Sequence, residues 1–333
     1  MMPLREELER DFLIATSGAP VVRLDGNAPV DLGDAVIAIG AFDGIHIGHR
    51  SLIERIVADA RRRGVAAVAV TFDPDPDSVV GPGPAPKLTS VDDRLHALAA
   101  SGVDTVAVVP FSRELAAMDH RAFFEQVLLP VMRVRAVHVG SDFRLGRGGK
   151  GTVEVLRAWG AACGIEVFGH SLVLDDGSAV SASRIRSLVA AGDVAAARSE
   201  LGRRFMVRGT IGSGRGQGTG MGFPTANVIV DPGLQVPGDG VYAALALVDG
   251  CVWPAAVNVG LPPTFAMLPG AARLEANLIG FSGNIRGENI SLAFDAFLRP
   301  SRVFDSTDEL IATVLGNIET IRETFGESGV RLV

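Results

Sequence analysis

Residues 35–49 read Ala-Val-Ile-Ala-Ile-Gly-Ala-Phe-Asp-Gly-Ile-His-Ile-Gly-His, and the architecture of the first half of the chain can be worked out from them. The apolar run 35–41 predicts a buried strand, and Asp43–Gly44 predicts a turn after it. An amphipathic helical pattern follows, with Leu52, Ile53 and Ile56 on its apolar side. A strand that turns directly into a helix brings free backbone N–H groups and the positive end of the helix dipole together. The stretch therefore predicts an anion site, such as one for a phosphate.

Two histidines stand at the entry to that helix. His46 and His49 flank Gly48, and either imidazole can donate a hydrogen bond to a phosphate there. Gly48 has no side chain, so a base or a phosphate can approach the backbone closely. Taken alone, an H-x-G-H motif is equally compatible with two surface histidines at a helix start. Its position between a buried strand and an amphipathic helix favours a nucleotide site.

The composition is that of an ordinary soluble enzyme, and the length of 333 residues predicts two domains. Hydrophobic residues make up 47% and charged residues 21%, and the net charge of −7 argues against nucleic-acid binding as the main role. Cys163 and Cys251 are too few and too isolated for a disulfide framework or a zinc site, which predicts a reducing compartment. Residues 1–10 lack a secretory apolar core, and no apolar run approaches a membrane span of about 20 residues. We therefore expect a cytoplasmic protein without a membrane partner.

Strand and helix signals alternate through the first half of the chain. This alternation predicts a Rossmann-like, doubly wound parallel sheet with helices on both faces. Ligands of such α/β sheets bind beyond the carboxyl ends of the strands, where the unusual segments 42–49, 71–76 and 140–146 fall. The expected strands are 35–41, 66–72, 103–109, 136–139 and 165–168, and the expected helices are 91–100, 121–131 and 152–162.

A polar segment at residues 180–186 follows the expected sheet. Ser181 or Ser183 can cap the helix that begins here, and Arg184 and Arg186 then lie in its first turn. Cations at a helix N-terminus oppose the helix dipole, so an anionic ligand such as pyrophosphate would explain their presence. The alternative is an N-cap with two solvated arginines.

The composition changes after residue 203, where short alternating runs replace the helical periodicity. Five or six strands at this spacing predict a small closed antiparallel barrel. A terminal helix, 307–324, would cover the barrel with an apolar stripe that includes Leu310, Val314 and Ile318. The expected strands are 205–211, 241–248, 252–259, 274–279 and 290–297.

Glycine occupies every second position from 212 to 222, near the start of this second part. A flexible linker is one interpretation. Residues 223–227 and a strand follow at once, which favours a glycine flap whose N–H groups wrap a polyphosphate. Thr225 and Asn227 then offer hard oxygen ligands to Mg²⁺. The sequence has no G-x-x-x-x-G-K-[ST] motif, so this is not a P-loop.

Together these motifs resemble the bifunctional riboflavin kinase/FAD synthetase of bacteria, from Val36 to Phe325. The H-x-G-H element is shared by many nucleotidyltransferases, whereas the G-F-P-T-A-N element is far more specific. The N-terminal signature is Gly40-x-Phe42-Asp43-Gly44-x-His46-x-Gly48-His49, supported by the segments 71–76, 140–144 and 181–186. The C-terminal signature is Gly222-Phe223-Pro224-Thr225-Ala226-Asn227, followed by Gly240–Tyr242, Asn258-x-Gly260, Pro263–Phe265, Glu275 and Leu298–Arg299.

The resemblance implies two ATP-dependent reactions on separate parts of the chain. Residues 1–186 would form an FMN adenylyltransferase of the nucleotidyltransferase fold, 187–203 a connecting helical segment, and 204–333 a riboflavin kinase barrel. Riboflavin would be phosphorylated to FMN, and FMN would then be joined to AMP from a second ATP with release of pyrophosphate. Mg²⁺ is the implied cofactor, and riboflavin, FMN and ATP are the implied ligands of a monomer or weak homo-oligomer.

The resemblance also implies roles for individual residues. Glu275 would accept the proton of the ribityl hydroxyl, while His46 and His49 would stabilise charge during adenylyl transfer. Nucleotide contacts are implied for Gly40, Phe42, Asp43, Gly48, Ser183, Arg186, Gly216, Gly222, Thr225 and Asn227, of which Thr225 and Asn227 would also bind the metal. Flavin contacts are implied for Asp142, Phe143, Thr264, Phe265 and Arg299.

The chain departs from that family's pattern at several positions. Asp75 stands where the family usually has histidine, which adds negative charge near a phosphate site. Ala182 replaces a usual serine, and Asn277 a usual histidine two residues after the kinase base. Residues 280–287 lack an expected acidic, tyrosine-containing pattern. The kinase changes lie beside the base and not on it, so we expect both activities to be kept.

Two other classes of function stay open. One is an adenylyl- or cytidylyltransferase that acts on another phosphorylated alcohol, with the barrel recruiting the substrate. The other is a flavin-binding regulator with impaired kinase activity, which the altered region 277–287 suggests. A class I aminoacyl-tRNA synthetase also carries H-I-G-H, but here no K-M-S-K-S-like segment follows and the net charge is unfavourable.

Overall fold

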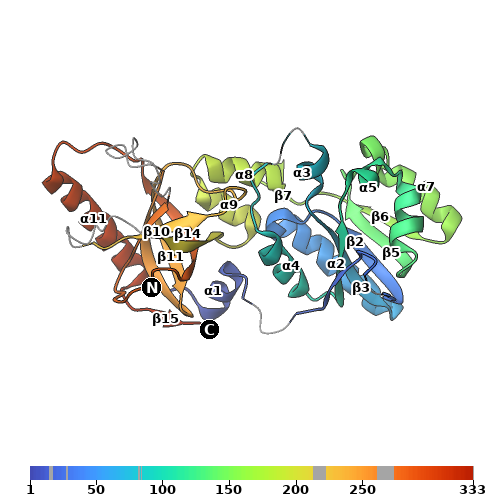
Figure 1. Ribbon diagram of the computed structural model, residues 1–333, viewed down its shortest axis with the longest axis horizontal. Helices are drawn as coiled ribbons and strands as arrows, with labels where there is room; N and C mark the ends of the chain where they lie inside the picture. The colour runs from blue at the N-terminus through green and yellow to red at the C-terminus, as the bar shows by residue number, and fades with distance from the viewer. Residues whose placement is uncertain are drawn as a thin grey trace. The chain divides into compact units, whose positions relative to one another are not determined.

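The computed structural model describes residues 1–14, 18–27, 29–81, 83, 85–212, 223–260 and 274–332. The chain forms two compact units, whose elements are labelled in Figure 1. One unit comprises residues 15–182, and the other combines residues 1–14 with residues 183–333. The N-terminal segment therefore belongs to the same unit as the C-terminal part of the chain.

The first unit is built on a parallel sheet of six strands in the order β1-β4-β3-β2-β5-β6. Every strand pairing in this sheet is parallel. The apolar runs predicted all of its strands except β1, which is three residues long and partly exposed. The strands are β1 Val21–Arg23, β2 Asp34–Ile39, β3 Ala66–Asp73, β4 Thr105–Pro110, β5 Arg133–Gly140 and β6 Glu166–His170.

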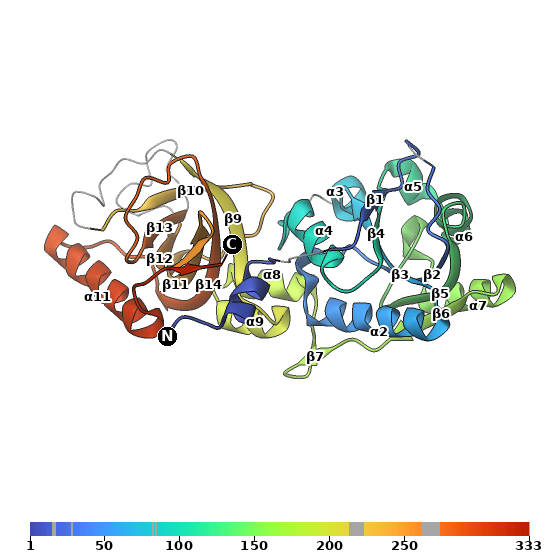
Figure 2. The same cartoon turned by 90° about the horizontal axis from the view of Figure 1, so that it is seen from below.

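Both faces of this sheet are covered by helices, which confirms the predicted doubly wound α/β fold. The side chains of β2 alternate between two apolar clusters because successive residues of a strand point to opposite faces. Ile37 and Ile39 pack with Trp159 in one cluster, and Val36 and Ala38 pack in the other. Figure 2 shows the helices of this unit from a second direction: α2 Ile47–Arg63, α3 Pro76–Val80, α4 Val91–Ala99, α5 Arg113–Ala117, α6 His120–Phe123 and α7 Val153–Cys163. Short helical turns lie at Asp43–Ile45, Phe124–Leu128 and Arg147–Gly149. A two-stranded hairpin is formed by β7 Leu174–Asp175 and β8 Ser178–Ala179.

The connections of this sheet reverse direction between β2 and β5. From β2 the chain continues to β3 and β4 on one side, whereas β5 and β6 lie on the other side. Ala38 of β2 pairs with His138 of β5, so the segments that begin at Gly40 and Gly140 leave the same edge of the sheet side by side. Open α/β sheets bind their ligands at such a position.

The second unit is a closed antiparallel barrel of six strands, as predicted. The strands follow the order β11-β14-β9-β10-β13-β12, and the pairing of β11 with β12 closes the ring. A short strand, β15 Val330–Arg331, adds to β12. The barrel strands are β9 Phe205–Gly212, β10 Ala226–Val230, β11 Gly240–Val248, β12 Cys251–Val259, β13 Leu274–Leu278 and β14 Asn289–Arg299.

Helices at both ends of the chain pack against the barrel. The terminal helix α11, Thr307–Phe325, was predicted, and it shares an apolar cluster with the N-terminal helix α1, Arg5–Asp11. Arg204 holds α1 in place, since its guanidinium lies 2.6 Å from the Asp11 carboxylate and 2.7 Å from that of Asp295. Two helices, α8 Ala182–Ala190 and α9 Val194–Leu201, lead into the barrel. None of the helices in the described part of the chain has the length and apolar character that a membrane span requires.

Candidate active sites

The turn after β2 places an aromatic ring against His49. Phe42 adopts φ of 55°, in the left-handed region, and its side chain is buried. Its ring meets the His49 ring edge-on, with centroids 5.2 Å apart. A Cβ on Gly40 would lie 3.3 Å from the Phe42 ring, so glycine leaves the space that the ring needs. Phe42 thus supports His49 from the protein side, and contacts of Gly40 or Phe42 with a nucleotide stay predictions.

His46 and His49, here called the histidine pair, stack on each other at the start of α2. Their ring centroids are 3.7 Å apart and the planes are inclined by 21°. A Cβ on Gly48 would lie 3.1 Å from the His46 nitrogen Nδ1, so the absent side chain makes room for the stacked rings. Burial, and secondarily the neighbouring His46, hold the pKa of His49 well below its ordinary value. His49 is therefore a neutral imidazole at neutral pH and offers one N–H donor.

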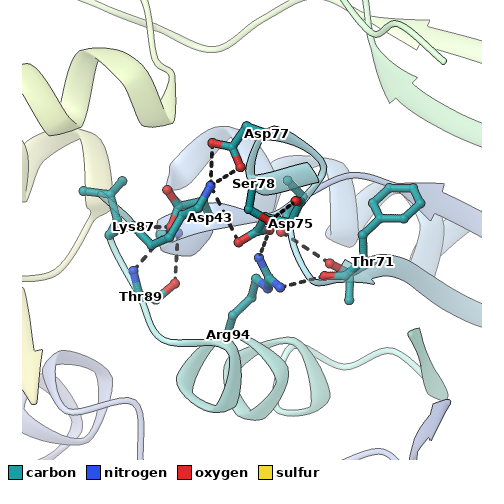
Figure 3. A network of polar contacts seen from close by, with 12 residues as sticks. Asp43, Thr71, Asp75, Asp77, Ser78, Lys87, Thr89 and Arg94 are labelled. Carbon is teal, nitrogen blue, oxygen red and sulfur yellow. Dashed lines mark hydrogen bonds and ion pairs between the residues drawn. The ribbon is translucent and has the colours of Figure 1, made fainter. Parts of the chain in front are cut away.

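A loop from a distant part of the chain is fastened to the turn before His46 (Figure 3). The Asp43 carboxylate oxygen Oδ1 accepts hydrogen bonds from the backbone N–H groups of Leu88 and Thr89, at 2.9 and 3.3 Å. The Gly44 N–H donates to the Thr89 hydroxyl oxygen at 3.2 Å. Asp43 is buried, so its carboxylate stabilises the turn from within the protein. A contact between Asp43 and a nucleotide stays a prediction.

Asp75 lies in a balanced group of charges beside that loop (Figure 3). Its carboxylate forms an ion pair with the guanidinium of Arg94, whose side chain is only 2% exposed. Arg94 also donates to the Phe72 carbonyl oxygen at 2.8 Å. The Lys87 ammonium lies 3.7 Å from the Asp75 carboxylate and 2.5 Å from that of Asp77. The expectation that Asp75 adds net negative charge to a phosphate site is therefore wrong, because Arg94 and Lys87 neutralise it within the protein.

The loop after β5 carries Asp142 and Phe143 to the edge of the sheet where the histidine pair also lies. A Cβ on Gly140 would come within 2.9 Å of the Asp142 carboxylate oxygen Oδ1, so glycine lets the loop fold back on itself. The Phe143 N–H donates to the Gly140 carbonyl oxygen at 3.0 Å. Asp142 is exposed and Phe143 is half-buried. Both side chains stand at the ligand-binding edge expected for this fold, while their contact with a flavin stays a prediction.

The arginines of α8 have different surroundings from one another. Arg184 forms an ion pair with Glu200, a carboxylate that is fully buried, so the protein itself supplies a counter-charge. Arg186 donates to the hydroxyl oxygen of Ser183 at 3.0 Å. Ser183 and Arg186 belong to the second compact unit, and their role in binding a nucleotide stays a prediction.

On the barrel, three polar residues form a row across neighbouring strands, here called the polar row. Asn227 of β10 pairs directly with Glu275 of β13, and Glu275 pairs directly with Asn258 of β12. Directly opposed residues of an antiparallel sheet point to the same face. Ala256 lies two residues before Asn258 and packs in the cluster that contains α11, so this is the outer face of the barrel. The structure therefore brings Asn227 and Glu275 together, as a shared site requires.

Asn258 is a candidate site residue for which the sequence implied no individual role. Its place in the Asn258-x-Gly260 motif was the only sequence signal for it. Its amide oxygen accepts a hydrogen bond from the Ser301 hydroxyl at 3.4 Å. Val241 of β11 pairs with both Asn258 and Arg299, so Arg299 continues the same register on β14. Burial and the nearby Arg302 lower the pKa of Arg299, a situation that an anionic ligand would relieve.

The oxygen donors at the start of β10 and on the paired strand β13 suit Mg²⁺. The Thr225 hydroxyl, the Asn227 amide oxygen and the Glu275 carboxylate are hard ligands, and Mg²⁺ in phosphoryl-transfer sites takes one or two protein ligands together with substrate phosphates. Within the described residues there is no group of three or more His, Cys, Asp or Glu side chains placed to hold a metal alone. Four of the predicted contacts, Gly216, Gly222, Thr264 and Phe265, lie outside the described residues.

Comparison of this sequence with family models and with known proteins shows which family the chain belongs to. A family model described as FAD synthetase matches residues 29–184, and one described as riboflavin kinase matches residues 201–325. The bifunctional riboflavin kinase/FMN adenylyltransferase of Escherichia coli (strain K12) is 33% identical over 293 residues, which cover 87% of this chain and 93% of that protein. This chain belongs to the bifunctional riboflavin kinase/FMN adenylyltransferase family.

Other members of the riboflavin kinase/FMN adenylyltransferase family and one solved structure agree. The protein of the same description from Bacillus subtilis (strain 168) is 31% identical over 282 residues, covering 83% of this chain and 88% of that protein. A crystal structure described as a macrolide-efflux protein from Streptococcus pneumoniae is 26% identical, covers 91% of this chain and 98% of its own, and superposes with a TM-score of 0.80. That likeness extends over both the parallel sheet and the barrel.

Proposed function

We propose that this chain makes FAD from riboflavin, with the two reactions on separate parts of the chain. It is a riboflavin kinase and an FMN adenylyltransferase, which use ATP to phosphorylate riboflavin and then to adenylylate FMN. The observation that carries this conclusion is the co-occurrence of both families in one chain, at residues 29–184 and 201–325. We assign adenylyl transfer to residues 1–186, a connecting role to 187–203 and the kinase to 204–333.

In the kinase reaction, the polar row supplies the base and the groups that orient the substrates. Glu275 accepts the proton of the ribityl hydroxyl while that oxygen attacks the γ-phosphate of ATP and ADP leaves. Asn227 stands beside Glu275 through direct strand pairing, which supports a role in holding the phosphates next to the base. Thr225 adds a hydroxyl at the start of the same strand, and Asn258 flanks Glu275 on the other side.

Thr225 and Asn227 are the residues that would hold Mg²⁺, together with the phosphates of ATP. When bound, the ion neutralises charge on those phosphates. The glycine positions Gly216 and Gly222, and the flavin contacts Thr264, Phe265 and Arg299, complete the proposed kinase site.

In the adenylyltransferase reaction, the histidine pair stabilises charge on the transferred phosphate. The FMN phosphate is already a nucleophile at neutral pH, so the step needs no general base. Its oxygen attacks the α-phosphate of ATP, and pyrophosphate leaves. His49 is neutral for the reasons given above and can donate its N–H to a phosphate oxygen as negative charge develops there. His46, Ser183 and Arg186 are proposed to donate in the same way, while Asp142 and Phe143 contact the flavin.

A flavin chromatogram of the reaction mixture tests this function. The full-length protein is incubated with riboflavin and MgATP, and the flavins are separated at successive times. We expect FMN to appear first and FAD to follow. Consumption of supplied FMN without any conversion of riboflavin would disprove the kinase. No conversion of either flavin would favour a transferase for another phosphorylated alcohol, and tight flavin binding without ATP consumption would favour a regulator.

A further inference from the structure

Asn277 holds the segment that carries the proposed phosphate and metal ligands. Its side-chain nitrogen Nδ2 donates a hydrogen bond to the Pro224 carbonyl oxygen at 2.8 Å. Asn277 is 8% exposed, and so is Phe223, the residue before Pro224. The contact is a partly buried hydrogen bond between β13 and the entry to β10, donated from a nearly buried side chain. If the Pro224 carbonyl lost this bond, the Asn277 amide would be left without that partner in a mostly buried position, which costs free energy.

The strand register explains why a side chain is needed at this point. In the ladder between β10 and β13, Ala226 pairs with Ala276 and Asn227 pairs with Glu275. One residue further along, Thr225 would come opposite Asn277. Pro224 has no N–H group, so a backbone ladder cannot continue there in the ordinary way. Pro224 can still accept through its carbonyl oxygen, and the Asn277 side chain donates to that oxygen where the regular ladder ends.

Alternation along β13 puts Asn277 on the same face as Glu275, the proposed base. Ala276 and Leu278, its neighbours in the strand, are buried on the opposite face. Asn277 therefore contacts the start of β10 from the side on which Asn227 stands. A shift of this start relative to β13 would move Thr225 and Asn227 away from Glu275 without disturbing the barrel core.

We propose that Asn277 is a positioning residue of the riboflavin kinase, which keeps Thr225 and Asn227 in register with Glu275 through its hydrogen bond to Pro224. This inference rests on the proposed kinase function. A histidine at this position would also present an N–H donor.

The experiment compares four full-length variants with the wild type. Asn277→Leu removes the donor at similar volume, and Asn277→Asp keeps the shape but offers only acceptors. Asn277→His restores a donor. Asn289→Leu is the matched control. Asn289 is an exposed residue of β14, and its amide oxygen accepts a hydrogen bond from the Thr210 hydroxyl at 3.3 Å. For each variant, FMN formation is measured against ATP and Mg²⁺ concentration, FAD formation from supplied FMN is measured in parallel, and thermal unfolding is recorded.

We expect Asn277→Leu and Asn277→Asp to lower kcat/KM for FMN formation by about ten- to a hundredfold, because misplaced groups lose that much in positioned reactions. Both should also need more Mg²⁺ for half-maximal rate. Asn277→His and Asn289→Leu should stay within about threefold of the wild type. FAD formation from supplied FMN should be unchanged in all four, which corrects for any loss of folded protein.

Three results would overturn the role of Asn277. The first is a wild-type rate and Mg²⁺ dependence in both Asn277→Leu and Asn277→Asp. The second is a loss of rate that follows the loss of thermal stability and is not rescued by histidine, which would show a packing role alone. The third is a wild-type protein that forms no FMN, and this one alone would also refute the proposed kinase.

Discussion

Asn227 of β10 and Glu275 of β13 face each other directly across two antiparallel strands. Residues paired in this way have Cβ atoms about 4.5–5.5 Å apart, so their side chains meet on one face without help from any loop. Asn258 of β12 extends the same row on the other side of Glu275. The barrel therefore supplies a rigid support for the proposed base and phosphate ligand, as a positioned reaction requires.

Glu275→Gln should separate the two activities. The amide cannot accept the hydroxyl proton, so FMN formation should fall by about 10²–10⁴-fold. FAD formation from supplied FMN should be unchanged, because that step is assigned to residues 1–186 and Glu275 has no role in it. Steady-state rates with riboflavin and with FMN as alternative substrates measure both effects. Loss of both activities would contradict independent sites.

His49→Ala should have the opposite effect. The histidine pair loses one N–H donor to the reacting phosphate, which should lower FAD formation by about 10²–10³-fold. The kinase should continue, so FMN should accumulate from riboflavin and ATP. The same chromatogram measures this result. Undiminished FAD formation would remove His49 from the site.

Gly48→Ala should lower activity without lowering stability. Alanine is favoured over glycine within a helix by about 0.5–1 kcal/mol, so the free energy of unfolding should not fall. The new Cβ would lie 3.1 Å from His46 Nδ1 and would push the ring out of its stack with His49. FAD formation should therefore drop while thermal stability is kept. A variant that melts earlier, with normal activity per folded molecule, would show that Gly48 serves only the helix.

Arg94→Met should destabilise the first unit by about 3–5 kcal/mol, because it leaves the buried Asp75 carboxylate without its main partner. Adding Asp75→Asn should recover much of that loss, since the uncompensated charge is then gone. Urea unfolding measures both variants. Arg133→Met is the control, because Arg133 is 62% exposed and its partner Asp34 keeps a second ion pair with Arg135, so the free energy of unfolding should change little. Equal losses in Arg94→Met and Arg133→Met would refute the buried ion pair.

The first unit should lose stability in mild acid through His138. This residue is nearly buried, with its nitrogen Nε2 3.0 Å from the Asp59 carboxylate and its Nδ1 2.9 Å from His170. Burial is the main cause that lowers the pKa of His138, although the Asp59 carboxylate opposes it, and burial also lowers the pKa of His170. The unfolded chain therefore takes up protons first, so stability is full above pH about 6.5 and falls below it.

Thermal melts at neutral and mildly acidic pH measure this effect. In a domain of this size each kcal/mol corresponds to about 2–4 °C in Tm. His138→Gln keeps a donor for Asp59 but cannot titrate, so the fall of Tm on acidification should be smaller than in the wild type. The fall should not vanish, because the pKa values of His49 and His170 are also lowered. An identical fall in the variant would show that His138 does not contribute.

The local sequence pattern was sufficient to predict the helices and strands that bury a regular apolar face. The run 35–41 and the alternating segments after residue 203 were correctly predicted as strands, because side-chain periodicity reports directly on which faces are buried. The helix α1 was not predicted to join the barrel. Its attachment depends on Arg204, whose partner Asp11 is 193 residues away in the sequence.

The neutralisation of Asp75 is a second long-range contact that the sequence did not predict. From the sequence, an aspartate in place of histidine predicted excess negative charge. Arg94 and Lys87 follow at different spacings, and no periodic pattern connects them with Asp75. Only the folded chain brings them within ion-pair distance.

The amino-acid order alone determined the two fold types, their sequence along the chain and the chemistry offered by the H-x-G-H and G-F-P-T-A-N motifs, because apolar periodicity and motif chemistry can be read from residues close together in the sequence. Only the tertiary structure shows that Asn227, Glu275 and Asn258 share one register. It also shows that Asn277 donates a hydrogen bond to Pro224 and that Asp75 is neutralised by its partners. The physical reason is that strand register and buried ion pairs join residues far apart in the chain, and their geometry is set by the packing of the whole unit.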